Sequence, residues 1–287
     1  MSPQGSADDN TTRKGLRPRD IFRLRANEGS VRTEYLGTPI DLLTFDQTVT
    51  RAVEAMRRRE PTQHVAMNVA KLVKMRRDPD LRRDVIASDI IGIDGMGIVW
   101  GARALGLPAA ERVAGIDLME RLLAVCAEEG FRPYFLGARQ AVLERGIEES
   151  ARRWPGLVLA GGRNGYFGPE DERHIVNAIR ESRADCLFIG MPTPRKERFL
   201  HEYREALGVP FIMGVGGSFD VLAGHVERAP AAVRQAGLEW LYRVYQEPRR
   251  MWWRYATTNT VYAGLLSAAL LRRALPAGAA RVGRSKS

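Results

Sequence analysis

Six short apolar runs, separated by stretches with helical periodicity, constrain the fold of this chain more than any other feature of its sequence. Each run carries Gly or Asn near its end, and they read HVAMNV (64–69), DIIGID (89–94), PYFLGA (133–138), LVLAGG (157–162), CLFIGM (186–191) and PFIMGV (210–215). Strands that are buried on both faces of a sheet are apolar throughout, as CLFIGM and PFIMGV are. The runs therefore predict six strands of a largely buried sheet.

The stretches between the runs, among them FDQTVTRAVEAMRRR (45–59) and GIDLMERLLAVCAEEG (115–130), place apolar residues at positions i, i+3, i+4 and i+7. That spacing is typical of amphipathic helices. Strands that alternate with helices form mostly parallel sheets. We therefore expect an α/β fold, with a mostly parallel, Rossmann-like sheet and helices on both faces.

Beyond residue 227 the strand pattern stops, and the chain reads as helix that is broken near Pro248. We expect an α/β catalytic body followed by a helical appendage, with a disordered tail at each end. The expected boundaries are 1–30 for the N-terminal tail, 31–227 for the body, 228–272 for the appendage and 273–287 for the C-terminal tail.

The appendage region carries most of the net charge of +10. From residue 228 to residue 287 there are eleven Lys and Arg residues against two Glu, a net charge of +9. Its arginines are interleaved with aromatic residues: Trp240, Tyr242, Tyr245, Trp252, Trp253 and Tyr255. Tryptophan and tyrosine favour the headgroup region of a bilayer, and basic residues are attracted to its anionic surface.

The same composition could bind RNA through base stacking and phosphate contacts. An apolar run at 261–271 has no use on nucleic acid, and it is shorter than the roughly 20 residues that span a bilayer. We therefore expect a helix that lies on a membrane surface and no nucleic-acid partner. The expected location is the cytoplasm, with the chain peripheral on the inner face of the cell membrane.

Four loops at predicted strand ends are candidates for ligand binding, because ligands of open α/β sheets bind beyond the carboxyl ends of the strands. They contain Asn68, Asp94–Gly97, Gly190–Pro192 and Gly214–Gly217. Glycines let a ligand approach the backbone and helix N-termini favour phosphate, so a nucleotide or another diphosphate is expected. The glycine fingerprints of dinucleotide-binding and P-loop proteins are absent, which counts against NAD and P-loop chemistry.

Neither a metal site nor a cofactor is expected. Cys126 and Cys186 lie sixty positions apart in apolar segments, and the four histidines show no ligand spacing. The one D-x-D sequence, Asp78-Pro79-Asp80, stands where a helix is expected to begin, and acidic residues are common helix caps there.

The order of motifs along the chain resembles that of the WecG/TagA/CpsF family of bacterial glycosyltransferases. The matching stretches are TPIDLLTFDQ, MNVAKLV, DGMGIVW, ERVAGIDLMERLL, YFLGA, GYFG, GMPTPRKERF, GVGGSFDVLAGHVERAP and LEWLYRVYQEPRRMWWRY. The resemblance implies an inverting, metal-independent transfer of a sugar from a UDP-sugar to a polyprenyl-diphosphate-linked sugar in cell-surface polysaccharide synthesis. The donor sugar, an N-acetylmannosamine type or another hexose, stays open.

Carried over by motif, the family's catalytic base falls on Asp94, its active-site asparagine on Asn68, and the arginine of its R-x-x-G-x-D motif on Arg112. Lys196 stands where relatives usually have glutamine, near the expected donor site. Basic residues of the appendage that would meet the diphosphates match Arg243, Arg250 and Arg254. Residues that could contact the donor nucleoside or its phosphates are Tyr166, Gly216 and Asp220.

Each of these residues also has a structural explanation. Asp94 could be a turn residue, Asn68 a strand end in the left-handed region, and Arg112 an ion-pair partner of Asp117. The structural alternatives for the others are a solvated helix face for Lys196, tight packing for Gly216, and core or capping roles for Asp220 and Tyr166. The alternative function is that of a non-catalytic regulator that binds nucleotides or nucleic acid. Self-association into a homo-oligomer that hides the appendage is a further expectation.

Overall fold

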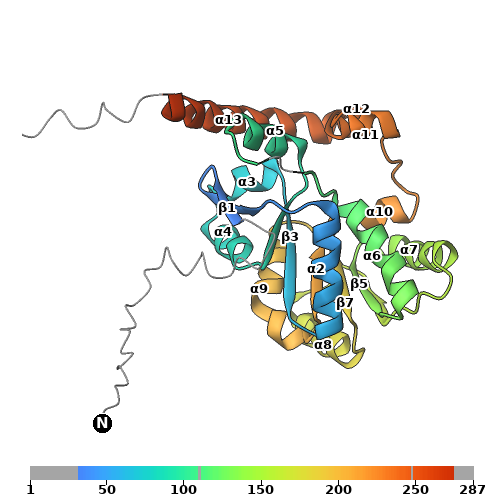
Figure 1. The fold of residues 1–287 in the computed structure, drawn as a ribbon. Helices are drawn as coiled ribbons and strands as arrows, with labels where there is room; N and C mark the ends of the chain where they lie inside the picture. The colour runs from blue at the N-terminus through green and yellow to red at the C-terminus, as the bar shows by residue number, and fades with distance from the viewer. Residues whose placement is uncertain (1–31, 109–110, 247, 275–287) are drawn as a thin grey trace, which may run out of the picture.

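The computed structural model describes residues 32–108, 111–246 and 248–274, and it contains a six-stranded parallel sheet (Figure 1). The strand order is β4-β3-β8-β7-β5-β6. The strands are β3 (Thr62–Met67), β4 (Ile90–Ile93), β5 (Pro133–Gly137), β6 (Gly161–Arg163), β7 (Cys186–Gly190) and β8 (Phe211–Gly214). Every pairing in this sheet is parallel, so the expected α/β class is confirmed.

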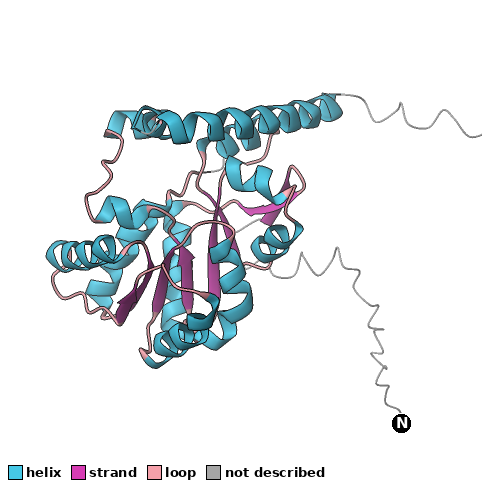
Figure 2. Cartoon of the chain, turned by 180° about the vertical axis from the view of Figure 1, so that it is seen from behind, coloured by secondary structure: helices cyan, strands magenta, loops and turns pink. Residues whose placement is uncertain are grey.

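Helices cover both faces of the sheet, as Figure 2 shows. One face packs against α2 (Phe45–Arg58), α6 (Gly115–Glu129), α7 (Gln140–Arg153) and α10 (Ser218–Leu222) through a core that includes Phe135, Phe188 and Met213. The other face packs against α3 (Val69–Met75), α4 (Pro79–Ile86), α5 (Met96–Ala104), α8 (Pro169–Glu181) and α9 (Arg195–Leu207). The neighbouring strands β3 and β8 therefore send their following helices to opposite faces, and ligands of open α/β sheets bind outside the carboxyl ends of the strands at such a point.

Local signals in the sequence set the helix ends. Thr44 and Gln47 form a capping box at the start of α2, in which the backbone N–H of Gln47 donates to the Thr44 hydroxyl at 3.2 Å. Asp78 caps α4 by accepting from the N–H of Leu81 at 2.9 Å, and Pro79 follows it in the first turn. The capping role expected for the D-x-D sequence is therefore confirmed.

Two features differ from the sequence-based expectation. Residues Arg32–Tyr35 (β1) and Thr38–Asp41 (β2) form an antiparallel hairpin, which the apolar pattern did not predict. Its two-residue turn has positive φ at Leu36 and Gly37, and leucine is not a residue that such turns favour. The run at 157–162 becomes strand only at Gly161–Arg163, because Leu157 and Leu159 pack into the core without joining the sheet.

The region after residue 227 is helical, with α11 (Ala231–Gln235), α12 (Glu239–Gln246) and α13 (Pro248–Ala274), and the break at Pro248 is confirmed. In Figure 1, α13 runs along one end of the body and lies beside α5. The Tyr262 side chain of α13 is buried among residues of α3 and α5, and Val261, Leu265 and Leu266 pack against the same cluster. Part of the apolar run at 261–271 is therefore used in packing on the body.

A hydrogen bond fixes this contact. The Tyr262 hydroxyl donates to the carbonyl of Gly97 at 2.5 Å and also meets the Tyr35 hydroxyl. A Cβ at Gly101 would lie 2.0 Å from the Tyr35 hydroxyl and 2.2 Å from that of Tyr262, so only glycine fits there. The C-terminal helix is thereby attached to the helix that follows Asp94.

Candidate active site

Asn68 and Asp94 meet at the carboxyl edge of the sheet. They follow β3 and β4, whose last residues, Met67 and Ile93, are paired in register. The backbone N–H of Asp94 donates to the carbonyl of Met67 at 2.9 Å. A Cβ at Gly95 would lie 3.3 Å from the Asn68 Cβ, so the glycine beside Asp94 lets the two loops approach closely. Two residues predicted for the site are thus brought together.

The Asp94 side chain is half-buried and lies at the beginning of α6. Its Oδ1 accepts from the N–H of Gly115, the first residue of that helix, at 3.4 Å. The N-terminus of a helix favours negative charge, because its first N–H groups lack partners within the helix. The position therefore suits an ionised carboxylate that remains partly open to solvent.

Asn68 caps the helix that leads away from β3. Its Oδ1 accepts from the N–H of Lys71 at 2.9 Å, and its φ of −134° is extended, not left-handed. The alternative of a left-handed strand end is therefore wrong. The cap fixes the Asn68 side chain at the edge of the sheet next to Asp94.

A buried charge cluster, formed by Lys71, Lys196 and Glu197, lies close to this pair. Glu197 is completely buried, and Lys71 and Lys196 are 8% and 5% exposed. Glu197 Oε1 lies 3.0 Å from Lys71 Nζ and 2.8 Å from Lys196 Nζ. The solvated position considered for Lys196 is therefore wrong. Burial follows from α9 docking on β8, where a Cβ at Gly214 would lie 2.5 Å from Lys196 Cε.

Charge and burial act together on the pKa values of this cluster. Burial lowers the pKa of the Lys71 ammonium to about 8, with the charge of Lys196 acting in the same direction and Glu197 and Asp94 opposing it. Burial alone would raise the pKa of Glu197, but the charges of Lys71 and Lys196 bring it down to about 2. At neutral pH, Glu197 is therefore ionised and Lys71 is mostly protonated.

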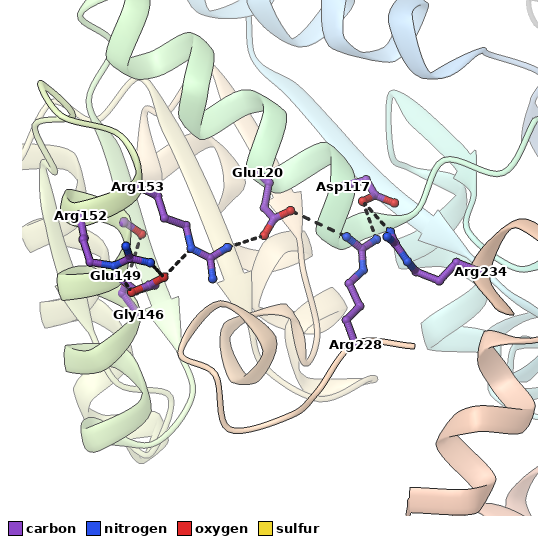
Figure 3. A network of polar contacts seen from close by, with 9 residues as sticks. Asp117, Glu120, Gly146, Glu149, Arg152, Arg153, Arg228 and Arg234 are labelled. Carbon is purple, nitrogen blue, oxygen red and sulfur yellow. Dashed lines mark hydrogen bonds and ion pairs between the residues drawn. The ribbon is translucent and has the colours of Figure 1, made fainter. Parts of the chain in front are cut away.

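Arg112 and Asp117 contact the C-terminal region instead of each other. Arg112 Nη1 lies 2.8 Å from Glu239 Oε2 at the start of α12, so the structural alternative of an ion pair with Asp117 is wrong. Asp117 Oδ1 instead lies 2.5 Å from Arg228 and 3.8 Å from Arg234. Figure 3 shows both arginines directed at Asp117, with Arg228 also near Glu120.

The contact between Arg112 and Glu239 has a consequence for the candidate site. Arginine forks bind phosphate and carboxylate groups in similar ways. A carboxylate from α12 therefore occupies Arg112 in the structure, and a donor phosphate would have to replace it.

A second group of predicted residues gathers at the ends of β5, β6 and β8. Tyr166 is exposed, and its hydroxyl accepts from Arg139 Nε at 3.4 Å. The charge of Asp220 also acts on Arg139, whose pKa is raised chiefly by its hydrogen bond to Tyr166. Arg139 was not predicted from the sequence, because a single arginine after a strand carries no specific signal.

Gly216 lies on the same edge. Its φ of +55° is in the left-handed region, and a Cβ there would meet no atom within 4 Å. Tight packing therefore does not explain this glycine, whereas the backbone conformation does. Its loop leaves open space at the end of β8.

Arg243, Arg250 and Arg254 belong to α12 and α13, but their side chains lie outside what the structure describes. Their contacts with diphosphate stay a prediction. Of the aromatic residues beside them, Tyr245, Trp252 and Trp253 are exposed, and the Trp240 and Tyr255 rings pack against each other at 5.7 Å.

Within the described ranges, no three His, Cys, Asp or Glu side chains are arranged to hold a metal ion. None of the helices described is both long and apolar enough to cross a bilayer. A cavity of about 330 Å³ lies between α4 and α9 at the amino ends of the strands, lined by residues such as Gln63, Asp84 and Arg204. It shares no residue with the carboxyl-edge site.

Comparison with known proteins agrees with the motif order. Residues 33–276 match the model of the glycosyl transferase WecG/TagA/CpsF family. The chain is also 37% identical, over 168 residues, to N-acetylglucosaminyldiphosphoundecaprenol N-acetyl-beta-D-mannosaminyltransferase of Bacillus spizizenii (strain ATCC 23059 / NRRL B-14472 / W23). That alignment covers 58% of this chain and 64% of the relative. Since the family match spans most of the sequence, this chain belongs to the WecG/TagA/CpsF family of glycosyl transferases.

Proposed function

We propose that this chain transfers a sugar from a UDP-sugar to a sugar carried on a polyprenyl diphosphate, with inversion at the anomeric carbon, in the synthesis of a bacterial cell-surface polysaccharide. Family membership supports the reaction class. The name of the Bacillus relative supports a lipid-diphosphate acceptor and makes N-acetylmannosamine the first donor to test. Family membership also weighs against the alternative of a non-catalytic regulator.

The observation that carries the proposal is the position of Asp94, half-buried at the N-terminus of α6 and beside Asn68. In the proposed reaction, an acceptor hydroxyl oxygen forms a bond to C1 of the donor sugar while the bond from C1 to the UDP oxygen breaks. Asp94 takes the hydroxyl proton as general base, and UDP leaves with the electron pair of the broken bond. Attack from the face opposite UDP inverts the anomeric carbon.

The leaving diphosphate gains negative charge, and this chain offers cations to stabilise it. Arg112 would bind a phosphate once Glu239 has moved away, and Lys196 lies at the end of β8 with its ammonium paired to Glu197. Tyr166, Asp220 and the Gly216 loop would hold the nucleoside at the ends of β5, β6 and β8. Asn68 would position the donor next to Asp94.

The experiment is a UDP-release assay across several UDP-sugars, with a short-chain lipid-diphosphate sugar as acceptor. Asp94→Asn keeps the size of the side chain and an acceptor for the Gly115 N–H, but it removes the base. Asp80→Asn is the matched control, because Asp80 is exposed on α4 and pairs with Arg83. UDP release that needs both donor and acceptor, and that is lost in Asp94→Asn alone, would support the proposal.

We also propose that the C-terminal helices bring the site to an anionic membrane surface. The exposed Tyr245, Trp252 and Trp253 support this, together with the basic composition of the region. A homo-oligomer that hides these helices in the absence of lipid stays a prediction, and cross-linking with and without vesicles tests it. The same assembly under both conditions would contradict it.

A further inference from the structure

The buried charge cluster contains more positive than negative charge. Lys71 and Lys196 share a single carboxylate oxygen, Glu197 Oε1, and the Thr193 hydroxyl donates to the same atom at 3.1 Å. The other oxygen, Glu197 Oε2, is buried and has no hydrogen-bond partner among the described residues. Burying an uncompensated charge is costly, so a further anion is expected close to the two ammonium groups.

Asp94 is the anion that this arrangement offers. Its negative charge acts on Lys71, in the direction that favours the protonated ammonium. Lys71 stands in the first turn of α3, where its N–H is bonded to Asn68, and Asn68 in turn lies against Gly95. With Asp94 ionised, the four charged side chains sum to zero; once Asp94 accepts a proton, they sum to +1.

We propose that Lys71 is a positioning residue for sugar transfer: held by Glu197, its ammonium keeps the half-buried Asp94 ionised until the acceptor hydroxyl arrives. This inference rests on the proposed function, because it assigns Lys71 a task in the same reaction. Without a neighbouring cation, partial burial favours the neutral carboxylic acid, which cannot act as a base. After proton transfer to Asp94, the four charged side chains carry a net charge of +1. This positive charge favours the departing diphosphate, which becomes more negative at the same moment.

The titration of Lys71 itself gives the proposal a distinctive signature. Burial lowers its pKa to about 8, so its charge is lost as the pH rises above that value. The charged groups that act on it are Lys196 and Glu197 from α9 and Asp94 after β4, while Lys71 in turn acts on His64 of β3. Without this charge the departing diphosphate is less well stabilised, so the rate of UDP release should fall on the alkaline side of about pH 8 in the wild-type protein.

Two substitutions test this, with UDP release measured from pH 5 to pH 9 on the full chain. Lys71→Met removes the charge at similar length. We expect the acidic limb of the pH–rate profile to move to higher pH. We also expect kcat at pH 7 to fall at least about tenfold, because the departing diphosphate loses a neighbouring positive charge. Lys71→Arg keeps a charge that does not titrate in this range, so the acidic limb should stay in place and the fall near pH 8 should disappear. A purely structural role would move neither limb.

Lys74→Met is the matched control, because Lys74 is the exposed lysine one turn further along the same helix. Circular dichroism and thermal unfolding show whether each variant is folded, and either Lys71 variant alone suffices for the test. The Lys71 proposal is overturned when the wild type transfers sugar, Asp94→Asn does not, and the pH profiles of both Lys71 variants superimpose on the wild-type profile. A wild-type chain that transfers sugar from no UDP donor overturns the proposed function, and with it the reaction in which Lys71 is placed.

Discussion

His64 shows how a single buried residue can make the stability of this fold depend on pH. Its side chain is 1% exposed, and neither ring nitrogen has a hydrogen-bond partner among the described residues. Burial, with the charge of Lys71 acting in the same direction, lowers the pKa of His64 to about 4. The unfolded chain, in contrast, takes up this proton near pH 6.5.

We therefore expect acid to destabilise the protein through His64. Between pH 6.5 and pH 4 the unfolded state binds the proton and the folded state does not, so the free energy of unfolding decreases as the pH falls through this window. The contribution between pH 7 and pH 4.5 is about 2 kcal/mol. Urea unfolding at these two pH values should show that His64→Leu removes this part of the acid sensitivity.

The exposed residue His174 provides the control, as His174→Gln should leave the pH dependence unchanged. Equal acid sensitivity in His64→Leu and the wild type would show that other groups dominate the effect.

Residues at strand ends were predictable from the sequence, whereas buried charges were not. Asp94 and Asn68 stand directly after strands, and parallel strands end at a common edge, so their proximity follows from the fold class. The polar run at the start of α9 gave no sign that Lys196 and Glu197 are buried, because burial depends on tertiary contacts such as that of Lys196 with Gly214. The burial of Lys71, which pairs with Glu197 of another helix, was missed because it too depends on tertiary contacts.

At the level of secondary structure, the contact of α13 with the body links the C-terminal helix to the loop that carries Asp94. The Tyr262 hydroxyl bonds to the carbonyl of Gly97, in the first turn of α5, three residues after Asp94. A movement of α13 would therefore act on the backbone next to the candidate base.

Tyr262→Phe should loosen this contact without emptying the apolar pocket around the ring. We expect the free energy of unfolding to fall by about 1–2 kcal/mol, because the partly buried Gly97 carbonyl and the buried Tyr35 hydroxyl lose a partner. Limited proteolysis should then cleave the C-terminal helix earlier than in the wild type.

Tyr245→Phe, on the exposed side of α12, is the control and should not change the cleavage rate. Identical unfolding and proteolysis of Tyr262→Phe and the wild type would mean that the apolar contacts alone hold α13.

The sequence predicted the six strands of the main sheet and the longer helices α2, α6, α7, α8 and α9, since hydrophobic periodicity reports burial on each face. The shorter helices α3, α5 and α10 were not predicted. The β1–β2 hairpin was missed because its Leu36-Gly37 turn lacks the usual residues, although its φ values are positive. The docking of α13 was also missed, because an apolar run predicts burial without saying against which surface.

On the scale of the whole molecule, the C-terminal helices lie across one end of the body, as both views of the fold show. The exposed Trp252 and Trp253, near the start of α13, stand ten and nine residues before the anchored Tyr262. One part of this helix is therefore attached to the body, while another part presents large aromatic side chains to solvent.

We expect the double variant Trp252→Ala/Trp253→Ala to bind anionic vesicles at least about tenfold more weakly, because the indole rings no longer enter the headgroup region. Co-sedimentation with vesicles rich in phosphatidylglycerol measures this, and phosphatidylcholine vesicles serve as the uncharged control. Unchanged binding of the double variant to the anionic vesicles would contradict a membrane role for these two residues.

The most direct test of the account is the rate of UDP release by Asp94→Asn at saturating donor and acceptor, relative to the wild type. A missing general base predicts a fall in kcat of at least about 100-fold with normal folding. A folded Asp94→Asn variant that releases UDP at the wild-type rate would contradict the assignment of Asp94 as the base.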